Sequence, residues 1–274
     1  MSIITLTTDY GLKDHFVASV KGCILSAMPQ AQIVDISHCI DFYNIANASY
    51  VVSGAYPNFP KGSIHMVLVE AEMNDQTSFL LTKFNGHYFL TADNGTITLL
   101  ATPEDETEIV KLHLPDFCTD TVSLFTYVST QILKNSPFDD LGTPISYNEC
   151  ELLIELRPKV AEDENSIKGA IIYMDHYGNA VTNITQDLFN RVGKGRKFAI
   201  IARKYSITKI HRFYADFNVE NQSIREFEGE MLYLFNDLDF LQLSIYKSDY
   251  ENVGNAKSMF GVSYRDSVIV EFYD

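Results

Sequence analysis

The feature that most constrains the fold is a regular alternation of strand-like and helix-like segments at the start of the chain. Ile3–Thr8 is a run of apolar and β-branched residues that predicts a buried strand, ended by the turn-forming residues 9–11. Apolar residues then recur at helical spacing from about Asp14 until Pro29 ends the helix. The order continues with a strand over Ile33–Ile36, a helix over Ile45–Tyr56 and a strand over His65–Val69. This order predicts a parallel sheet, whose functional loops follow the carboxyl ends of the strands.

The remainder of the N-terminal half predicts a hairpin and a further helix. Phe79–Thr82 and Tyr88–Thr91 are strand-like runs, and the Asn85-Gly86 dipeptide between them favours the tight turn of a hairpin. Val122–Leu133 carries apolar residues at helical spacing. These elements add antiparallel pairing and a helical layer to the predicted sheet.

A polar stretch over Arg157–Asn165, without apolar periodicity, predicts a boundary between two domains. Beyond it, turn residues separate short apolar runs at Gly169–Tyr173, Phe198–Ala202, Glu230–Leu234, Leu241–Ile245 and Val268–Phe272. This layout is typical of a small β-sandwich or barrel. We therefore expect an N-terminal α/β domain over residues 1–160, with a largely parallel sheet, and a smaller all-β domain over residues 168–274.

Charge and composition exclude several classes of partner. The 274 residues include 21 Lys and Arg against 36 Asp and Glu, a formal net charge of −15. A nucleic-acid binder needs a basic face, but the one basic window, Arg191 to Lys197, is typical of a solvated turn. No apolar run approaches the roughly 18 residues of a membrane span, and no secretion signal is evident. Because the four cysteines are also far apart, we expect a cytoplasmic protein with reduced thiols that binds neither nucleic acid nor membrane.

Common catalytic motifs are absent from the sequence. There is no G-x-x-x-x-G-K-[ST] phosphate loop, no G-x-S-x-G elbow, no H-E-x-x-H zinc motif and no G-x-G-x-x-G dinucleotide motif. The seven histidines occur singly, so a metal site would need ligands from distant loops. We expect neither a bound metal nor a cofactor.

Two acidic segments are candidates for ligand binding, and each has a structural alternative. Asp9 follows a predicted parallel strand, where its carboxylate can accept hydrogen bonds from a ribose diol; alternatively, it caps the following helix. Asp175 and Asn179 flank a glycine turn, where a carboxylate can hold an ammonium and an amide can read the edge of a base. Alternatively, this second segment is a hairpin turn that the Asp side chain stabilises.

Four short motifs together resemble one enzyme family. They are Thr7–Gly11, Asp35–Ile40, Ala92–Gly95 and Asp175–Asn179 with Asn183. In this order and spacing they resemble the S-adenosylmethionine (SAM) hydroxide adenosyltransferases, adenosine-forming SAM hydrolases related to fluorinases and chlorinases. The resemblance covers essentially the whole chain. It implies a small adenosyl ligand and a homotrimer, with each site between one subunit's N-terminal domain and a neighbour's C-terminal domain.

The resemblance also implies a reaction and three ligand contacts. A water-derived nucleophile would attack the ribose 5′ carbon, and methionine would leave to give adenosine. Because a sulfonium is a good leaving group, the protein has to align the reactants and accept the proton that water loses. By resemblance, Asp9 would hold the ribose hydroxyls, Asp175 the methionine ammonium and Asn179 the adenine edge.

The chain departs from the family at its three activating residues. Glu70 stands in place of the Asp of a V-V-D-P-G-V-G motif, Thr77 in place of an Arg, and Cys118 in place of the His of an F-H-G-R-D motif. Glu is one methylene longer than Asp, and a misplacement of about an ångström lowers a rate on the order of a hundredfold. Cys118 is either a reactive thiolate or an inert, partly buried thiol, and the lack of a basic neighbour in sequence favours the inert thiol.

A later family motif, Asn-Ser-x-Gly, is also altered. Asn236–Asp239 stands in its place, and an acidic side chain there would repel the methionine carboxylate. A shorter nucleoside would then suit the pocket better than the full sulfonium ligand.

A third possibility, an acidic interaction scaffold with no small ligand, rests only on the net charge, and Asp9, Asp175 and Asn179 argue against it. Two functions are favoured over it. One is an enzyme that hydrolyses SAM, or a related 5′-substituted adenosine, to adenosine and methionine with Glu70 in altered geometry. The other is a non-catalytic nucleoside- or SAM-binding protein that keeps the fold and the trimer without the activating residues. Membership of the family favours the enzyme.

Overall fold

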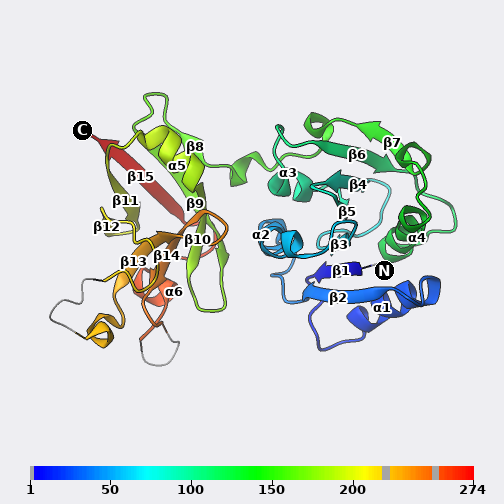
Figure 1. Cartoon of the computed structure of the whole chain (residues 1–274), viewed down its shortest axis with the longest axis horizontal. Coiled ribbons are helices and arrows are strands. Elements are labelled where there is room, and N and C mark those ends of the chain that lie inside the picture. The colour runs from blue at the N-terminus through cyan, green and yellow to red at the C-terminus, as the bar shows by residue number, and fades with distance from the viewer. Residues whose placement is uncertain (1–2, 218–222, 249–252) are drawn as a thin grey trace. The chain divides into compact units, whose positions relative to one another are not determined.

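The computed structural model describes residues 3–217, 223–248 and 253–274 and divides into two units, Met1–Leu153 and Ile154–Asp274 (Figure 1). The division falls before the polar stretch at 157–165 that marks the boundary in the sequence. Lys159–Val160 (β8) pairs antiparallel with Ser166–Met174 (β9), so this stretch forms a hairpin of the second unit instead of a linker.

The first unit contains a seven-stranded sheet in the order β2-β1-β3-β5-β4-β6-β7. Its parallel strands are β1 (Ile3–Thr8), β2 (Gln32–Ser37), β3 (Ile64–Leu68) and β5 (His87–Ala92). Its antiparallel strands are β4 (Phe79–Phe84), β6 (Thr107–Leu112) and β7 (Gly142–Ile145). The predicted hairpin is confirmed as β4 and β5, and both turn residues, Asn85 and Gly86, adopt the left-handed backbone that a tight hairpin turn requires.

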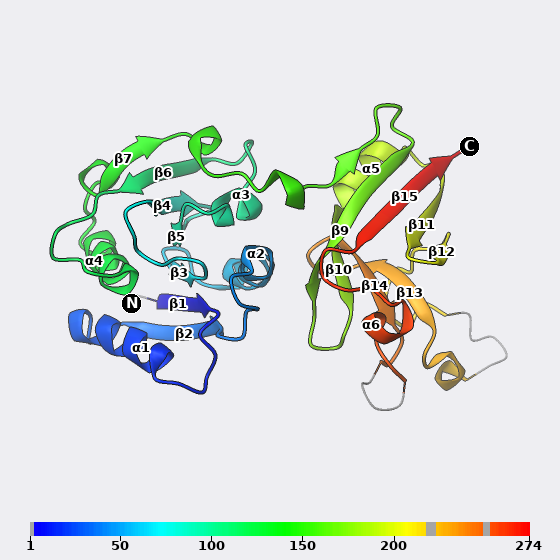
Figure 2. The ribbon, with the colours of Figure 1, turned by 180° about the vertical axis from the view of Figure 1, so that it is seen from behind.

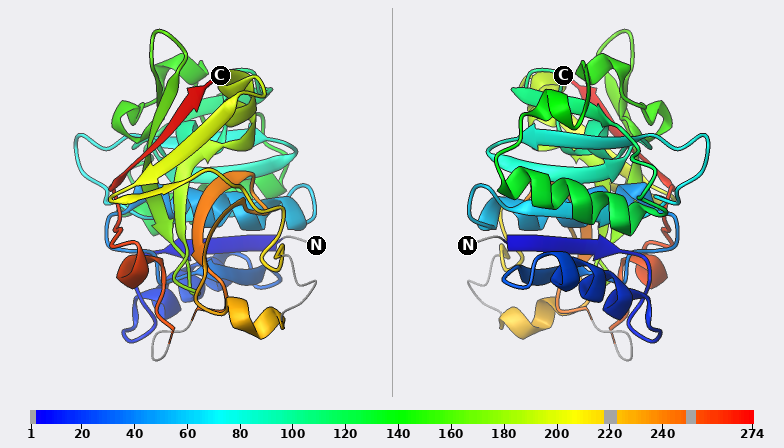
Figure 3. Two further views of the ribbon diagram at one scale, coloured as in Figure 1. Left: turned by 90° about the vertical axis from the view of Figure 1, so that its left-hand side faces the viewer. Right: turned by 90° about the vertical axis from the view of Figure 1, so that its right-hand side faces the viewer.

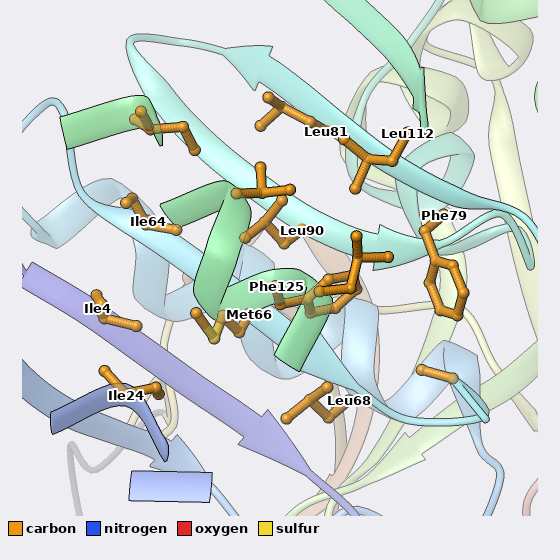
Figure 4. Packing of buried hydrophobic residues seen from close by; sticks show 14 of the residues in the cluster. Ile4, Ile24, Ile64, Met66, Leu68, Phe79, Leu81, Leu90, Leu112 and Phe125 are labelled. Carbon is orange, nitrogen blue, oxygen red and sulfur yellow. The ribbon is translucent and has the colours of Figure 1, made fainter. Parts of the chain in front are cut away.

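Helices cover both faces of this sheet. The helices α1 (Phe16–Ala27) and α4 (Thr121–Leu133) pack on one face, and α2 (Ile45–Ala55) and α3 (Thr96–Leu100) pack on the other (Figures 1 and 3). Figure 4 shows the core under α1 and α4, where Ile24 and Phe125 meet the strand residues Ile4 and Met66. Full burial of each such side chain contributes about 1.5–3 kcal/mol to the hydrophobic driving force of folding.

The parallel strands place several polar residues at one edge of the sheet. Thr8 at the end of β1 pairs with Leu68 at the end of β3, and β5 runs parallel to β3 on its other side. Asp9, Glu70 and Asn94 follow the ends of these three strands. All three residues therefore lie at the edge of the sheet where the functional loops are expected.

The second unit is built on one antiparallel sheet that curves into a nearly closed, barrel-like form, in the order β12-β11-β15-β9-β10-β14-β13. Its further strands are β10 (Ala180–Thr185), β11 (Lys197–Ala202), β12 (Tyr205–Ile207), β13 (Met231–Phe235), β14 (Phe240–Ile245) and β15 (Ser267–Tyr273). Figure 2 shows β9 running between β15 and β10. The fold class is confirmed: an N-terminal α/β unit with parallel strands is followed by a smaller β unit.

Short helices complete the two units. The α-helices α5 (Gln186–Gly193) and α6 (Ala256–Met259) belong to the second unit. The 3-10 helices are η1 (Tyr56–Asn58), η2 (Phe138–Asp140), η3 (Tyr147–Glu149), η4 (Ile154–Leu156) and η5 (Ile224–Phe227). The basic window lies at the end of α5, where Lys194 pairs with Glu164. Among the residues that the structure describes, no helix has the length and apolar character needed to cross a membrane.

Candidate functional site

Asp9 lies in the loop after β1 and is bound by the loop after β2. Its Oδ2 atom accepts a hydrogen bond of 2.9 Å from the Tyr43 backbone N–H, and only 9% of the residue is exposed. Tyr43 adopts the left-handed region, with φ 57°, which is unusual for a residue other than glycine. The following helix has His15 as its N-cap and no side-chain cap. The alternative that Asp9 caps this helix is therefore wrong, and its role in binding ribose stays a prediction.

Glu70 follows β3 with its side chain exposed and its backbone in the left-handed region, φ 46°. Such a conformation costs on the order of 1–3 kcal/mol for a residue other than glycine, so the surroundings have to hold it. Asn94 does so: its Nδ2 atom donates to the carbonyls of Val69 at 3.2 Å and Glu70 at 3.0 Å. The hydroxyl and N–H of Thr96 both donate to Asn94 Oδ1, which fixes the amide. The backbone that carries the Glu70 carboxylate is therefore held in a defined conformation.

Thr77 and Cys118 supply neither of the functional groups that the family has at these positions. The Thr77 hydroxyl donates to the Glu72 carbonyl at 2.8 Å within its own loop. Cys118 is 8% exposed and packs in the core of the first unit. Burial raises the pKa of the Cys118 thiol, and the nearby Asp120 raises it further. The thiol therefore stays protonated, which supports the inert alternative.

The start of α4 lies beside these loops. Thr121 donates its hydroxyl proton to the Ala71 carbonyl, next to Glu70. Burial raises the pKa of Tyr10, and the carboxylates of Asp9 and Asp120 add to this effect. This edge of the sheet therefore gathers carboxylates and a protonated phenol, an arrangement that favours a cationic or neutral ligand over an anion.

Asp175 and Asn179 in the second unit form one hydrogen-bonded turn between β9 and β10. The Asp175 carboxylate accepts from the Asn179 N–H at 2.8 Å and from its side-chain Nδ2 at 2.7 Å. Between them Gly178 has φ +76°, and an added Cβ would lie 2.4 Å from the Cβ of Asn255, so only glycine fits. The hairpin-turn alternative is confirmed as the local structure. It holds the carboxylate and the amide side by side, and their ligand contacts stay predictions.

A polar cluster around this turn was missed by the sequence reasoning. Gln242 donates through Nε2 to the Tyr214 phenol oxygen at 2.7 Å and to Ser244 Oγ at 2.9 Å, and the Asn179 side chain lies near the phenol. Burial raises the pKa of Tyr214, and the Asp175 charge raises it further, so the phenol keeps its proton. The available signal was two polar residues, Gln242 and Ser244, at alternating positions of an apolar strand, which face the same side of the sheet.

Two other asparagines have mainly structural roles. Asn183 donates through Nδ2 to the Leu156 carbonyl at 2.7 Å and accepts from the Ala170 N–H at 2.9 Å, so its amide joins backbone segments. Asn236 donates to Gln242 Oε1 at 3.2 Å, which links the turn at 236–239 to the polar cluster. Asp237 and Asp239 in this turn are exposed.

The structure thus brings Asp9 and Glu70 to one sheet edge of the first unit, and Asp175 and Asn179 to one turn of the second. In the part of the chain that the structure describes, no three His, Cys, Asp or Glu residues are grouped so that they could hold a metal ion.

Comparisons with known proteins identify the family. The profile of the SAM hydroxide adenosyltransferase N-terminal domain matches residues 4–142, and that of the C-terminal domain matches residues 169–269. The (R)-S-adenosyl-L-methionine hydrolase of Methanocaldococcus jannaschii is 28% identical over 277 residues, which cover 98% of this chain and 95% of that protein. The hydrolase of the same name from Salinispora arenicola is 25% identical over 72% of this chain and 77% of its own, and a Nocardia brasiliensis fluorinase is 20% identical over 70% and 74%.

A solved structure agrees with this assignment at the level of the fold. The crystal structure of an uncharacterized conserved protein from Thermotoga maritima superposes with a TM-score of 0.76 at 24% identity, covering 98% of this chain and 99% of its own. Because both family domains match in order, the chain belongs to the SAM hydroxide adenosyltransferase family.

Proposed function

We propose that this protein hydrolyses SAM to adenosine and methionine. The observation that carries the proposal is the position of Asp9 and Glu70 after neighbouring parallel strands, in a chain whose curated relatives are named (R)-S-adenosyl-L-methionine hydrolases. These relatives favour an enzyme over a non-catalytic binding protein. A cytoplasmic location and a trimeric assembly belong to the same proposal.

Each of the three binding residues contacts a different part of the ligand. Asp9 accepts the ribose hydroxyls, since the Tyr43 N–H occupies only one of the several lone pairs that a carboxylate offers. Asp175 pairs with the methionine ammonium, and Asn179 hydrogen-bonds the adenine edge. The partly exposed ring of Tyr214, which lies near Asn179, offers an aromatic surface next to that amide.

The reaction joins a water oxygen to C5′ and breaks the bond between C5′ and sulfur. The electron pair of that bond goes to sulfur and yields the neutral thioether of methionine. Water loses one proton, and Glu70 is the carboxylate placed to accept it as a general base. Thr77 carries no positive charge with which to stabilise a preformed hydroxide, so proton removal accompanies attack in this chain.

The distribution of the site residues over the two units is compatible with the homotrimer that the family resemblance implies. Asp9 and Glu70 belong to the first unit, whereas Asp175 and Asn179 belong to the second. In the proposed assembly, one subunit supplies the first pair and a neighbour supplies the second. Light scattering coupled to gel filtration should give three times the chain mass of 31.0 kDa.

Product analysis tests the proposed reaction. The purified protein is incubated with SAM, and adenosine and methionine are separated by chromatography; equal amounts of both should accumulate. Asp9→Ala should abolish them, and calorimetry with adenosine reports binding independently. Binding of adenosine by the wild-type protein without product would support the non-catalytic alternative, and neither binding nor product would contradict both.

A further inference from the structure

A buried histidine after β2 connects a surface ion pair to the loop that carries Asp9. His38 is 3% exposed, and its Nδ1 atom lies 2.9 Å from the Thr8 hydroxyl oxygen. Its Nε2 atom lies 3.0 Å from Asp35 Oδ1, although the contact is not aligned as a hydrogen bond. On the other side, Lys21 Nζ lies 2.6 Å from Asp35 Oδ2. A chain of polar contacts thus runs from the protein surface to the end of β1.

The direction of the hydrogen bonds follows from the charge on Asp35. Burial raises the pKa of this carboxyl, but the hydrogen bond from Lys21 and the neighbouring imidazole of His38 outweigh burial and lower the pKa below the usual value. An ionised carboxylate only accepts, so the nitrogen of His38 that faces it carries a proton. In the neutral imidazole Nδ1 is then an acceptor, and Thr8 donates its hydroxyl proton to it. The Thr8 oxygen in turn accepts the Tyr10 N–H at 3.2 Å.

Backbone hydrogen bonds join the same two loops on both sides of Asp9. The Gly11 N–H donates to the His38 carbonyl at 2.7 Å, and the Ile40 N–H donates to the Thr8 carbonyl at 3.4 Å. Because Asp9 lies between Thr8 and Gly11, both of its flanks are attached to the His38 loop. The Tyr43 N–H holds the carboxylate itself.

We propose that His38 is a positioning residue that, together with Thr8 and Asp35, fixes the loop conformation in which Asp9 receives the ribose. The assignment of the ribose rests on the proposed function, whereas the ordering of the loop does not. His38 touches no reacting atom in this proposal. It acts through the Thr8 hydroxyl and through its own carbonyl.

The same sheet contains a matched control. Thr5, three residues before Thr8 on β1, hydrogen-bonds a second buried histidine, with 2.7 Å between its Oγ1 atom and His65 Nδ1. His65 contacts His87 at 3.1 Å within the aromatic core. Thr5 pairs with His65 in the body of the sheet, whereas Thr8 stands at the end of its strand. Removing the Thr5 hydroxyl therefore removes an equivalent buried bond away from the loop.

Hydrogen exchange on the wild-type protein and three variants tests the positioning role without any ligand. Thr8→Val should speed exchange of the Tyr10, Gly11 and Tyr43 amides at least about tenfold, since a lost buried hydrogen bond lowers the local opening energy. Thr8→Ser should restore slow exchange because it keeps the hydroxyl, and Thr5→Val should leave these amides unchanged. Equal exchange in Thr8→Val and the wild-type protein would overturn the proposal, as would equal acceleration by Thr5→Val.

Steady-state kinetics on Thr8→Val and on further variants at His38 and Asp9 then test the consequence for the ligand. Thr8→Val and His38→Gln should raise KM for SAM about tenfold with kcat changed less than about threefold, because a ground-state contact is weakened. Asp9→Asn combined with Thr8→Val should be no worse than Asp9→Asn alone. Additive effects would overturn the coupling to Asp9. If the wild-type protein gave no product, the proposed function would fail while the exchange experiment would still decide the ordering of the loop.

Discussion

The two regions of the predicted site differ in how the chain holds their side chains. In the binding region, Asp9 and Asn179 are buried and hydrogen-bonded, and Asp175 is locked to Asn179 by two hydrogen bonds. In the region of the activating residues, Glu70 extends an exposed carboxylate, and the Thr77 hydroxyl is occupied by its own loop. Preorganised groups lose little freedom when a ligand binds. The comparison separates hydrogen-bonded side chains, at which we propose that the ligand binds, from one exposed carboxylate, which we propose as the base.

The largest effect that would sharpen this comparison is expected at Glu70. Glu70→Gln removes the proposed base and keeps the size of the side chain, so kcat for SAM should fall roughly 10²- to 10⁴-fold. The affinity for adenosine, measured by calorimetry, should stay within about twofold. Glu72→Gln is the control, since Glu72 is also exposed and lies two residues further along the same loop. Turnover by Glu70→Gln at the wild-type rate would assign the chemistry to another group.

A smaller effect, on the affinity for adenosine instead of on kcat, is expected in the binding region. Asp9→Asn keeps the shape of the side chain but replaces a charged acceptor, and hydrogen bonds to charged groups contribute about 1.5–3 kcal/mol. The dissociation constant for adenosine should therefore rise roughly 10- to 100-fold. A loss of turnover with unchanged adenosine affinity would contradict the proposal that one region binds the ligand and the other carries out the chemistry.

Acidification should affect the fold separately from the chemistry. Burial, with a contribution from the charge of His87, lowers the pKa of His65 to about 3, so His65 is neutral in the folded protein. The unfolded chain takes up a proton near pH 6.5, and stability therefore falls as the pH drops from about 6.5 towards 3. Between pH 7.5 and 5.5 the free energy of unfolding should decrease by about 1.4 kcal/mol.

Urea denaturation at the two pH values measures this change. His65→Gln is the control, and it should reduce the dependence on pH while it lowers stability at pH 7.5. An unchanged dependence in this variant would assign the effect to other titrating groups.

The smallest effect is expected at Cys118. Its thiol is protonated and packed in the core, so Cys118→Ala should leave kcat within about twofold of the wild-type value. Initial rates with saturating SAM measure this. A large drop in kcat at unchanged thermal stability would restore the thiolate as a candidate reactive group.

Much of the fold was predictable because its signals are local. The strands β1 to β3 alternate with helices, and Asn85-Gly86 marks the hairpin. The strand β10 was missed because Thr182 and Asn183 interrupt its apolar pattern, although both are buried and hydrogen-bonded. The polar stretch at 157–165 lies just after the division between the two units, and part of it forms a short hairpin of the second unit.

In the candidate site, too, residues with a local sequence signal could be predicted and residues that depend on distant parts of the chain could not. Asp9 and Glu70 could be predicted because each follows a parallel strand within two residues. The cluster of Tyr214 and Gln242 around Asn179 could not, because it depends on pairing between β10 and β14, far apart in sequence. The left-handed backbone of Glu70 likewise depends on Asn94, which a separate turn supplies.

Isotope labelling tests the central claim most directly. The wild-type protein is given SAM in water enriched in ¹⁸O, and the adenosine formed is analysed by mass spectrometry. The account predicts that the adenosine carries the label at its 5′ oxygen and that methionine forms in equal amount without label, because the water oxygen becomes bonded to C5′ and sulfur leaves. Adenosine without the label, or no adenosine at all, would contradict it.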